Sequence, residues 1–207
     1  MNVLELENSD LTHQMLKYNF ALDKLNTELN ILIKEYEFKN NYQPVEHIKS
    51  RIKTIESAIK KLEKKGYEIS LDNLLEHVHD MVGIRIVCSF LSDVYDIVNI
   101  IEKSDFIKIK EKKDYIKNPK QSGYSSYHLI VLVPIFLDDK KEYIEAEIQI
   151  RTMAMDFWAS LDHKIQYKFR DSIKDEIKEE MYNCSLAINK LDNKMLELNK
   201  EVEKYRN

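Results

Sequence analysis

Polar and apolar residues alternate most clearly between residues 143 and 152. Because successive side chains of a β-strand point to opposite faces, a strand here would bury one face and present a polar row on the other. The polar row consists of Glu145, Glu147, Gln149 and Arg151. An antiparallel strand with one solvated face shows the same alternation, so this stretch becomes a candidate site only if other polar clusters lie beside it.

Apolar residues also repeat in alternating steps of four and three near both ends of the chain. The first series runs from Leu11 to Tyr36, and the second runs from Ile177 to Val202. This spacing predicts one long helix at each end, with an apolar seam that packs on the domain or on another helix. Because two such seams flank one modest domain, we predict that the chain forms a homo-oligomer.

The region between these seams predicts a mixture of helices and strands. We expect a helix from about Val45 to Lys65, because apolar residues recur at helical spacing and Gly66 follows as a C-cap. The other expected elements are strands at 82–89, 106–113, 129–136 and 143–152, and helices at 91–103 and after Thr152. Only 3 Gly and 3 Pro occur in the chain, which favours a helix-rich fold with few irregular loops.

Three side chains of the first expected internal helix could bind phosphate. Lys53, Ser57 and Lys61 recur every four residues and would lie one above another, opposite the apolar stripe. A solvated lysine-rich face shows the same spacing and is the more common explanation. The spacing alone leaves both interpretations open.

Arg85 interrupts the near-continuous apolar run of the expected strand at 82–89. A charge inside a buried strand requires a charged partner or a ligand. Just before this strand, Asp80 follows His79, a pair that suggests a metal-dependent phosphohydrolase dyad. That chemistry also needs a further His and a distant Asp, so we prefer Asp80 as a carboxylate at the entrance of the strand.

The segment that joins the expected strands at 106–113 and 129–136 combines cations, aromatic rings and a flexible backbone. Its candidate residues are Lys113, Lys117, Lys120, Tyr124 and His128, placed around one Pro and one Gly. Lysines suit phosphates and a tyrosine ring suits stacking on a base, so the composition favours nucleotide recognition. An ordinary polar connection between two strands is an equally good explanation.

Length and charge limit the classes of protein that the chain can be. A chain of 207 residues with 43% hydrophobic residues suits one domain with helical extensions. The net charge of -4 argues against nucleic-acid binding over the whole surface, although a local cluster can still bind phosphate. We expect a cytoplasmic protein without a membrane segment, because the N-terminus lacks a signal-peptide pattern and no apolar run could span a bilayer. Cys88 and Cys184 show neither disulfide nor zinc spacing, and we expect both to be reduced core residues.

Four blocks of sequence then carry a resemblance to a known family. They are H-I-K-S-R-I-K (47–53), D-M-V-G-I-R-I-V-C-S-F (80–90), K-D-Y-I-K-N-P-K-Q-S-G-Y-S-S-Y-H (113–128) and E-I-Q-I-R-T-M-A-M-D-F-W-A-S-L-D-H-K-I (147–165). They resemble the synthetase domain of the RelA/SpoT homologue superfamily, and more narrowly the small alarmone synthetases of its RelQ and RelP branches. The resemblance implies an α/β (α+β) fold, with a mixed nucleotidyltransferase-like sheet flanked by helices and with long N- and C-terminal helices. It also implies a catalytic domain at 45–168 between helical oligomerisation segments at 1–44 and 169–207.

The resemblance implies transfer of pyrophosphate from ATP to the 3′-hydroxyl of GDP, GTP or GMP, with ppGpp and pppGpp as alarmone products of the stringent response. It assigns ATP binding to Arg51 and Arg85 at the adenine and to Lys53, Ser57 and Lys61 at the phosphates. It assigns Mg2+ to Asp80 and Glu147. Glu147 would also help to deprotonate the attacking hydroxyl.

The same resemblance assigns the acceptor side of the site. Tyr124 would stack on guanine, Lys113, Lys120 and His128 would face the acceptor's phosphates, and Gln149 and Arg151 would support the cleft. We add Asp156 for guanine selection, because one carboxylate can accept hydrogen bonds from both N1–H and N2–H of the base. Relatives of the RelQ branch form homotetramers and bind an alarmone activator through basic residues of the first helix. The equivalent stretch here, 26–33, holds neither Lys nor Arg.

Two alternatives stay open beside this interpretation. A toxic relative of the same fold would pyrophosphorylate adenine nucleotides or tRNA, which requires basic surface outside the cleft. A catalytically silent nucleotide sensor or RNA-binding oligomer would not need to keep both Asp80 and Glu147. We expect no nucleic-acid partner other than a regulatory RNA.

Overall fold

The computed structural model describes residues 9–137, 139–168 and 174–205. Its strands are β1 (Val45–Ile52), β2 (Val82–Cys88), β3 (Lys108–Asp114), β4 (Tyr127–Leu137) and β5 (Lys140–Thr152). Its helices are α1 (Ser9–Asn40), α2 (Ile55–Lys65), α3 (Leu71–His77), α4 (Leu91–Glu102), α5 (Met153–Lys168) and α6 (Asp175–Glu203). The eight N-terminal residues and 169–173 lie outside the described residues, and so do the corresponding parts of the segments expected at 1–44 and 169–207.

The strands form one sheet in the order β1-β2-β5-β4-β3. β2 and β5 are parallel, whereas the other neighbouring strands are antiparallel. After β2 the chain forms α4 and the β3–β4 pair, and then returns to the centre of the sheet as β5. This return is required because parallel neighbours cannot be joined by a tight hairpin. The expected mixed sheet flanked by helices is therefore confirmed.

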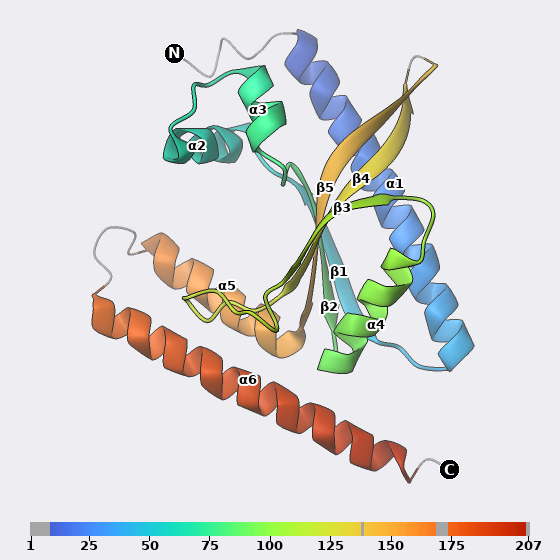
Figure 1. Cartoon of the computed structure of the whole chain (residues 1–207), viewed down its shortest axis with the longest axis vertical. Helices are drawn as coiled ribbons and strands as arrows, with labels where there is room; N and C mark the ends of the chain where they lie inside the picture. The colour runs from blue at the N-terminus through green and yellow to red at the C-terminus, as the bar shows by residue number, and fades with distance from the viewer. Residues whose placement is uncertain (1–8, 138, 169–173, 206–207) are drawn as a thin grey trace.

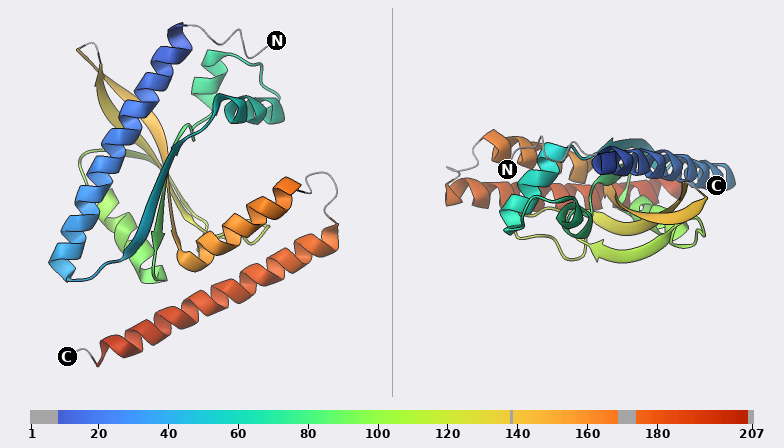
Figure 2. Two further views of the ribbon diagram at one scale, coloured as in Figure 1. Left: turned by 180° about the vertical axis from the view of Figure 1, so that it is seen from behind. Right: turned by 90° about the horizontal axis from the view of Figure 1, so that it is seen from above.

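Helices lie on both sides of this sheet (Figures 1 and 2). α1 and α4 lie along one side, where their apolar side chains form the core with the sheet. On the other side, α2 and α3 lie near one end of the sheet, and α5 and α6 lie near the opposite end (Figure 1). The second side is thus divided between two helix pairs.

The alternation expected on β5 is confirmed. Ile144, Ala146, Ile148 and Ile150 are buried in the core under α1 and α4. Glu145, Glu147 and Gln149 are half-buried on the opposite face of the strand. One strand therefore supplies both the centre of the core and the polar row, because its side-chain period is two.

The helix expected over Val45–Lys65 is wrong in its first half. Residues 45–52 form β1, which pairs with β2, and α2 begins only at Ile55. Thr54 is its N-cap, with a side chain that accepts a hydrogen bond from the Ser57 amide. Ile48 and Ile52 are four residues apart, so they fit a helix as well as one face of a strand. Pairing with β2 decides between the two, because it satisfies the backbone groups of the edge of β2.

One further helix, α3, has no counterpart among the expected elements. Ser70 is its N-cap and accepts a hydrogen bond from the Asn73 amide at 3.1 Å. With 7 residues the helix is too short to show a helical repeat of apolar positions.

The two apolar seams have different environments. The α1 seam packs on the sheet of its own chain, where Leu25 and Leu29 are fully buried. The α6 stripe faces away from the domain, since Leu191 is 58% exposed and Leu198 is 43% exposed. Cys184 is exposed for the same reason, so its expected place in the core is wrong, whereas Cys88 is buried as expected. No helix of the described segments is both long and apolar enough to cross a membrane.

The core position of β5 predicts a large loss of stability on truncation. Ile148 is fully buried, so we expect Ile148→Ala to lower the free energy of unfolding by about 2 to 5 kcal/mol, measured by urea denaturation. The matched change Ile31→Ala, at a position that is 55% exposed, should cost less than about 0.5 kcal/mol. Equal losses in the two variants would contradict the packing described.

Candidate active site

The polar face of the sheet lines a cavity at β1, β2 and β5. The register pairs Arg51 with Gly83 and Gly83 with Glu147 across three adjacent strands. Residues of these strands and of the turn before β2 line the cavity, namely Lys49, Ser50, Arg51, Asp80, Gly83, Ile84, Arg85, Glu147 and Gln149. Gly83 provides no side chain between Arg51 and Glu147, so the floor of the cavity stays open at this point.

Asp80 lies on one wall of the cavity and is held by two lysines. Lys53 Nζ donates to its Oδ2 at 2.7 Å, and Lys61 Nζ donates to its Oδ1 at 2.8 Å. Burial raises the pKa of Asp80, but the hydrogen bonds and charges of the two lysines outweigh burial and lower the pKa below its ordinary value. Lys53 precedes α2 rather than lying on it, so the helical ladder inferred from the sequence is wrong, although both lysines converge on one carboxylate. Ser57 lies in the first turn of α2, one turn before Lys61.

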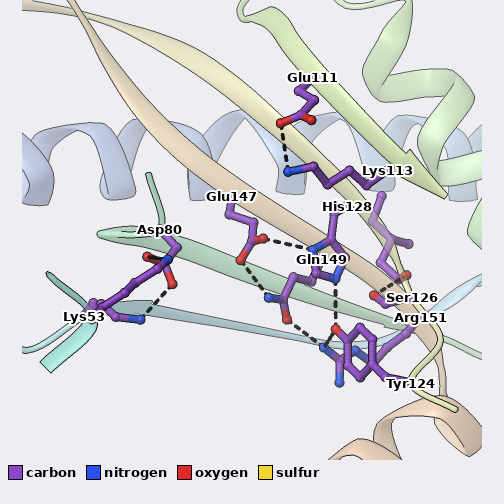
Figure 3. A network of polar contacts seen from close by, with 12 residues as sticks. Lys53, Asp80, Glu111, Lys113, Tyr124, Ser126, His128, Glu147, Gln149 and Arg151 are labelled. Carbon is purple, nitrogen blue, oxygen red and sulfur yellow. Dashed lines mark hydrogen bonds and ion pairs between the residues drawn. The ribbon is translucent and has the colours of Figure 1, made fainter. Parts of the chain in front are cut away.

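Glu147 lies across the cavity from Asp80, on β5 (Figure 3). Its Oε1 contacts His128 Nδ1 at 2.9 Å, and its Oε2 accepts a hydrogen bond from Gln149 Nε2 at 2.7 Å. Burial raises the pKa of Glu147, but the contacts with His128 and Gln149 outweigh it, so the net effect lowers the pKa. The carboxylate is therefore ionised and held in one orientation at neutral pH.

These contacts continue into a closed ring of hydrogen bonds, drawn in Figure 3, which we call the polar ring. Its members are Glu147, His128, Tyr124, Arg151 and Gln149. Arg151 Nη2 donates to the Tyr124 hydroxyl at 3.0 Å and to Gln149 Oε1 at 2.6 Å. The Tyr124 hydroxyl lies 2.9 Å from His128 Nε2.

The contacts of the polar ring form a consistent set of donors and acceptors when His128 carries a proton on Nδ1 only. In that tautomer Nδ1 donates to Glu147, and Nε2 accepts from the Tyr124 hydroxyl. Tyr124 then accepts from Arg151 and donates to His128, so every contact of the ring joins one donor to one acceptor.

Arg85 has a partner, as its place in a buried strand required. Its Nη1 lies 3.3 Å from Asp156 Oδ1, and Arg151 Nη1 lies 3.5 Å from the same oxygen. Asp156 therefore joins the arginine of β2 to the polar ring. The side chain of Arg85 remains 31% exposed at the cavity, so it can contact a ligand as well.

The residues between β3 and β4, which we call the acceptor loop (115–126), bring one more cation to the polar ring, and β3 brings another. Lys120 Nζ lies 4.9 Å from the centroid of the Tyr124 ring and 4.6 Å from that of Tyr115. Lys113, at the end of β3, is the cross-strand partner of His128 and pairs with Glu111 at 2.9 Å. Lys117 points elsewhere, because it pairs with Asp114 and lies over Tyr95.

The residues predicted from the sequence thus lie in two groups in the structure. One group surrounds Asp80, and the other is the polar ring with Lys113, Lys120 and Asp156; Glu147 joins the two across the cavity. Lys49 was missed, although it lines the cavity and lies opposite Arg85 on β1. It would have been found if residues 45–52 had been interpreted with a period of two, because Lys49 and Arg51 then share a face.

Comparison with known proteins finds one family, and the match to its members covers nearly the whole chain. A family model described as "Region found in RelA / SpoT proteins" matches residues 50–172. The GTP pyrophosphokinase YwaC of Bacillus subtilis (strain 168) is 44% identical over 203 residues, which cover 98% of this chain and 97% of the relative.

Solved structures with the same fold include two small alarmone synthetases from Bacillus subtilis. Synthetase 2 has a TM-score of 0.84 at 44% identity, covering 93% of this chain and 100% of the other. Synthetase 1, bound to its product pppGpp, has a TM-score of 0.87 at 30% identity, covering 95% of this chain and 100% of the other.

The lowered pKa values of Asp80 and Glu147 predict how stability depends on acid. Both lie below the ordinary values of 3.8 and 4.5, so the unfolded chain binds more protons than the folded chain as the pH falls through this range. The stability that these groups contribute is complete above about pH 5 and is lost as the pH falls through their folded pKa values. We expect the free energy of unfolding to decrease between about pH 5 and pH 3 in urea titrations. In Asp80→Asn the free energy of unfolding should decrease less steeply with falling pH. Asp105→Asn changes an exposed position and should keep the wild-type slope. Identical slopes in all three proteins would contradict the prediction.

Proposed function

The chain belongs to the RelA/SpoT family, and we propose that it is a GTP pyrophosphokinase that makes the alarmones ppGpp and pppGpp. It transfers the β,γ-pyrophosphate of ATP to the 3′-hydroxyl of GDP or GTP. One observation carries this proposal: two ionised carboxylates, Asp80 and Glu147, line one cavity between paired lysines and a ring of base- and phosphate-binding groups. The identity to YwaC over nearly the whole of both chains supports the same activity.

We propose that ATP binds at the β1, β2 and α2 side of the cavity. Arg51 and Arg85 enclose the adenine, and both line the cavity from adjacent strands. The phosphates bind to Lys53, Ser57 and Lys61, which lie at or near the start of α2. The phosphates then replace Asp80 as the partner of the lysines, so each ammonium exchanges one anion for another, and Asp80 becomes available to a metal ion.

The guanine nucleotide binds on the other side, at the acceptor loop. Tyr124 stacks on the base and Asp156 accepts from its N1–H and N2–H groups, while Lys113, Lys120 and His128 face the phosphates. Gln149 and Arg151 hold Tyr124 and Glu147 in place through the polar ring. The acceptor's 3′-hydroxyl thus lies toward Glu147, which is shared between the two groups of residues.

The residues present fit a magnesium ion. Asp80 and Glu147 line the same cavity, and the described segments hold no group of three or more His, Cys, Asp or Glu that could bind a metal ion by itself. Two protein carboxylates suit Mg2+, which usually takes its remaining ligands from water and substrate phosphates. When bound, the ion would offset the negative charge of the reacting phosphates.

The transfer needs positioning and charge compensation rather than a protein nucleophile. The 3′-oxygen attacks the β-phosphorus of ATP, its bond to that phosphorus forms, and the bond from the β-phosphorus to the α–β bridging oxygen breaks to release AMP. Glu147 accepts the proton of the 3′-hydroxyl. The lowered pKa of Glu147 keeps it ionised and ready to accept, while His128 and Gln149 fix its direction.

We further propose that the enzyme is a homotetramer assembled through α1 and α6 around the catalytic residues 45–168. The exposed apolar stripe of α6 supports an oligomer, since Leu191, Met195 and Leu198 would otherwise remain in water. We place the enzyme in the cytoplasm, where ATP and GTP are available to it.

Removal of the proposed base tests the reaction. We expect Glu147→Gln to lower kcat by about 100-fold or more, because the amide cannot accept the hydroxyl proton. The measurement uses labelled ATP with Mg2+ and, in turn, GMP, GDP, GTP, ADP and tRNA, with the products separated by chromatography. Glu142→Gln is the matched control. Glu142 lies on the same strand but does not line the cavity, and its carboxylate pairs with Lys17 at 2.6 Å. Label that moves only to ADP or tRNA, or to no acceptor, would refute the proposed function.

The division of the cavity into two nucleotide sites makes a separate prediction. Tyr124→Ala should raise KM for GTP by about 5- to 150-fold, the worth of one stacked base, with KM for ATP within about twofold of the wild type. Arg51→Ala should do the reverse, with a rise of about 2- to 30-fold in KM for ATP. Steady-state kinetics with each substrate varied in turn decide the matter, and equal effects on both KM values would contradict the division.

A further inference from the structure

The face of α6 that lies against the domain buries two polar residues beside the half-buried Ile188, whereas Leu191 and Leu198 of its apolar stripe are exposed. Ser185 and Asp192 are 3% and 6% exposed and lie two turns apart on one face of the helix. A helix that docks through general apolar burial would show the opposite distribution. Specific polar contacts therefore help to hold α6 on its own domain, beside Ile188, which lines a small cavity together with Met155 and Trp158.

The first of these contacts joins α6 to the acceptor loop at Gly123. The space beside Gly123 is so small that a Cβ atom there would lie 2.0 Å from Ser185 Oγ and 2.5 Å from Ser185 Cβ. The loop backbone therefore rests directly on the helix. Gly123 also has φ of +87°, a conformation that favours glycine, and its amide closes a turn onto Lys120 O at 2.8 Å.

This contact lies one residue from Tyr124, whose side chain is proposed to stack on guanine. Tyr124 follows Gly123 directly, and its carbonyl accepts a hydrogen bond from the Lys120 amide at 3.1 Å. The two acceptor-site residues Lys120 and Tyr124 thus bracket the turn that Ser185 supports. A shift of α6 at Ser185 would move both of them.

The second contact joins α6 to the end of β5. Thr152 Oγ1 donates to Asp192 Oδ2 at 2.7 Å and accepts from the Met155 amide at 3.2 Å, and Thr152 is fully buried. Thr152 directly follows Arg151, the member of the polar ring that holds the Tyr124 hydroxyl. Asp192 therefore fixes the strand end from which Arg151 reaches the acceptor site.

A third contact reports on the same interface. Trp158 of α5, the only tryptophan of the chain, donates from Nε1 to Met181 O of α6 at 3.2 Å. It is 4% exposed, and it lines a small cavity together with Gly123 and Ser185. Its fluorescence should respond when α6 and the acceptor loop move relative to each other.

We propose that α6 positions the acceptor subsite, with Ser185 supporting the turn that carries Tyr124 and Asp192 fixing the strand end that carries Arg151. This inference rests on the proposed function and adds two positioning residues to it. The described contacts of Ser185 and Asp192 lead to the guanine-nucleotide side, whereas Arg51, Lys53 and Lys61 lie on β1, before α2 and on α2. Positioning by α6 therefore acts on binding of the guanine nucleotide and leaves binding of ATP unchanged.

The test uses the full chain and two variants of the helix. Ser185→Val places a larger side chain against Gly123, and Asp192→Leu removes the acceptor of the Thr152 hydroxyl. Each should raise KM for GTP by about tenfold and leave KM for ATP within about twofold of the wild type. Asp192→Asn keeps an acceptor oxygen and should restore near-wild-type values.

The control and a second readout separate positioning from loss of structure. Ala187→Val makes a matched enlargement at an exposed position of the same helix and should leave both KM values unchanged. Light scattering and thermal unfolding check that assembly and folding are intact. In the wild type, titration with GDP should change Trp158 emission, titration with a non-hydrolysable ATP analogue should not, and Ser185→Val should weaken the response to GDP.

Each remaining outcome refutes a specific statement. Absence of pyrophosphate transfer by the wild type refutes the proposed function itself. If the wild type transfers pyrophosphate, two results refute only the positioning role of α6. One is an equal kinetic loss in Ser185→Val and Ala187→Val, and the other is an equal rise in the KM values for GTP and ATP. If the variants do not fold, the positioning role of α6 is refuted when GDP leaves the Trp158 emission of the wild type unchanged.

Discussion

The parallel pairing of β2 with β5 is the constraint on which the site depends. It places Gly83 beside Glu147 and Arg85 beside Gln149, so residues more than sixty positions apart share one face of the sheet. A slip of one residue would turn the polar row of β5 into the core and the isoleucines into the cavity, because side chains alternate with period two. Burial of Ile144, Ala146, Ile148 and Ile150 under α1 and α4 prevents that slip. The same hydrophobic contacts that stabilise the fold therefore set the register of the site.

The half-buried charges of the cavity have partners inside the protein. Asp80 is paired with Lys53 and Lys61, Glu147 with His128 and Gln149, and Arg85 with Asp156. Such pairing is expected, since an unpaired charge in a poorly solvated site is costly. In the proposed complex, nucleotide phosphates and a metal ion would replace these ionic partners instead of meeting isolated charges. The pairing keeps both carboxylates ionised while the side chains stay ordered for substrate.

The terminal helices place their apolar faces in opposite directions. α1 packs its seam on the sheet and is part of the core, whereas α6 contacts the domain through Ser185, Asp192 and the Trp158 contact and presents its apolar stripe outward. In the proposed homotetramer, a partner subunit on the outer stripe would also bear on the inner contacts of α6, which would link assembly to chemistry. The acceptor loop and the end of β5 are the parts of the site that this helix reaches.

The local pattern of polar and apolar residues determined most of the helices and strands of this protein. The period of two on β5, the heptads of α1 and α6 and the apolar run of β2 each identified an element, and four sequence blocks identified the candidate residues. Tertiary structure decided what local pattern could not. Ile48 and Ile52 suit either a helix or a strand, and only pairing with β2 made residues 45–52 a strand, which also brought Lys49 to the cavity. Likewise, the α6 heptad does not reveal that a polar face would dock on Gly123 and Thr152, because that choice depends on the shape of a surface assembled from distant segments. Spacing along a chain fixes which side chains share a face, but which surface meets that face is settled by the packing of the whole molecule.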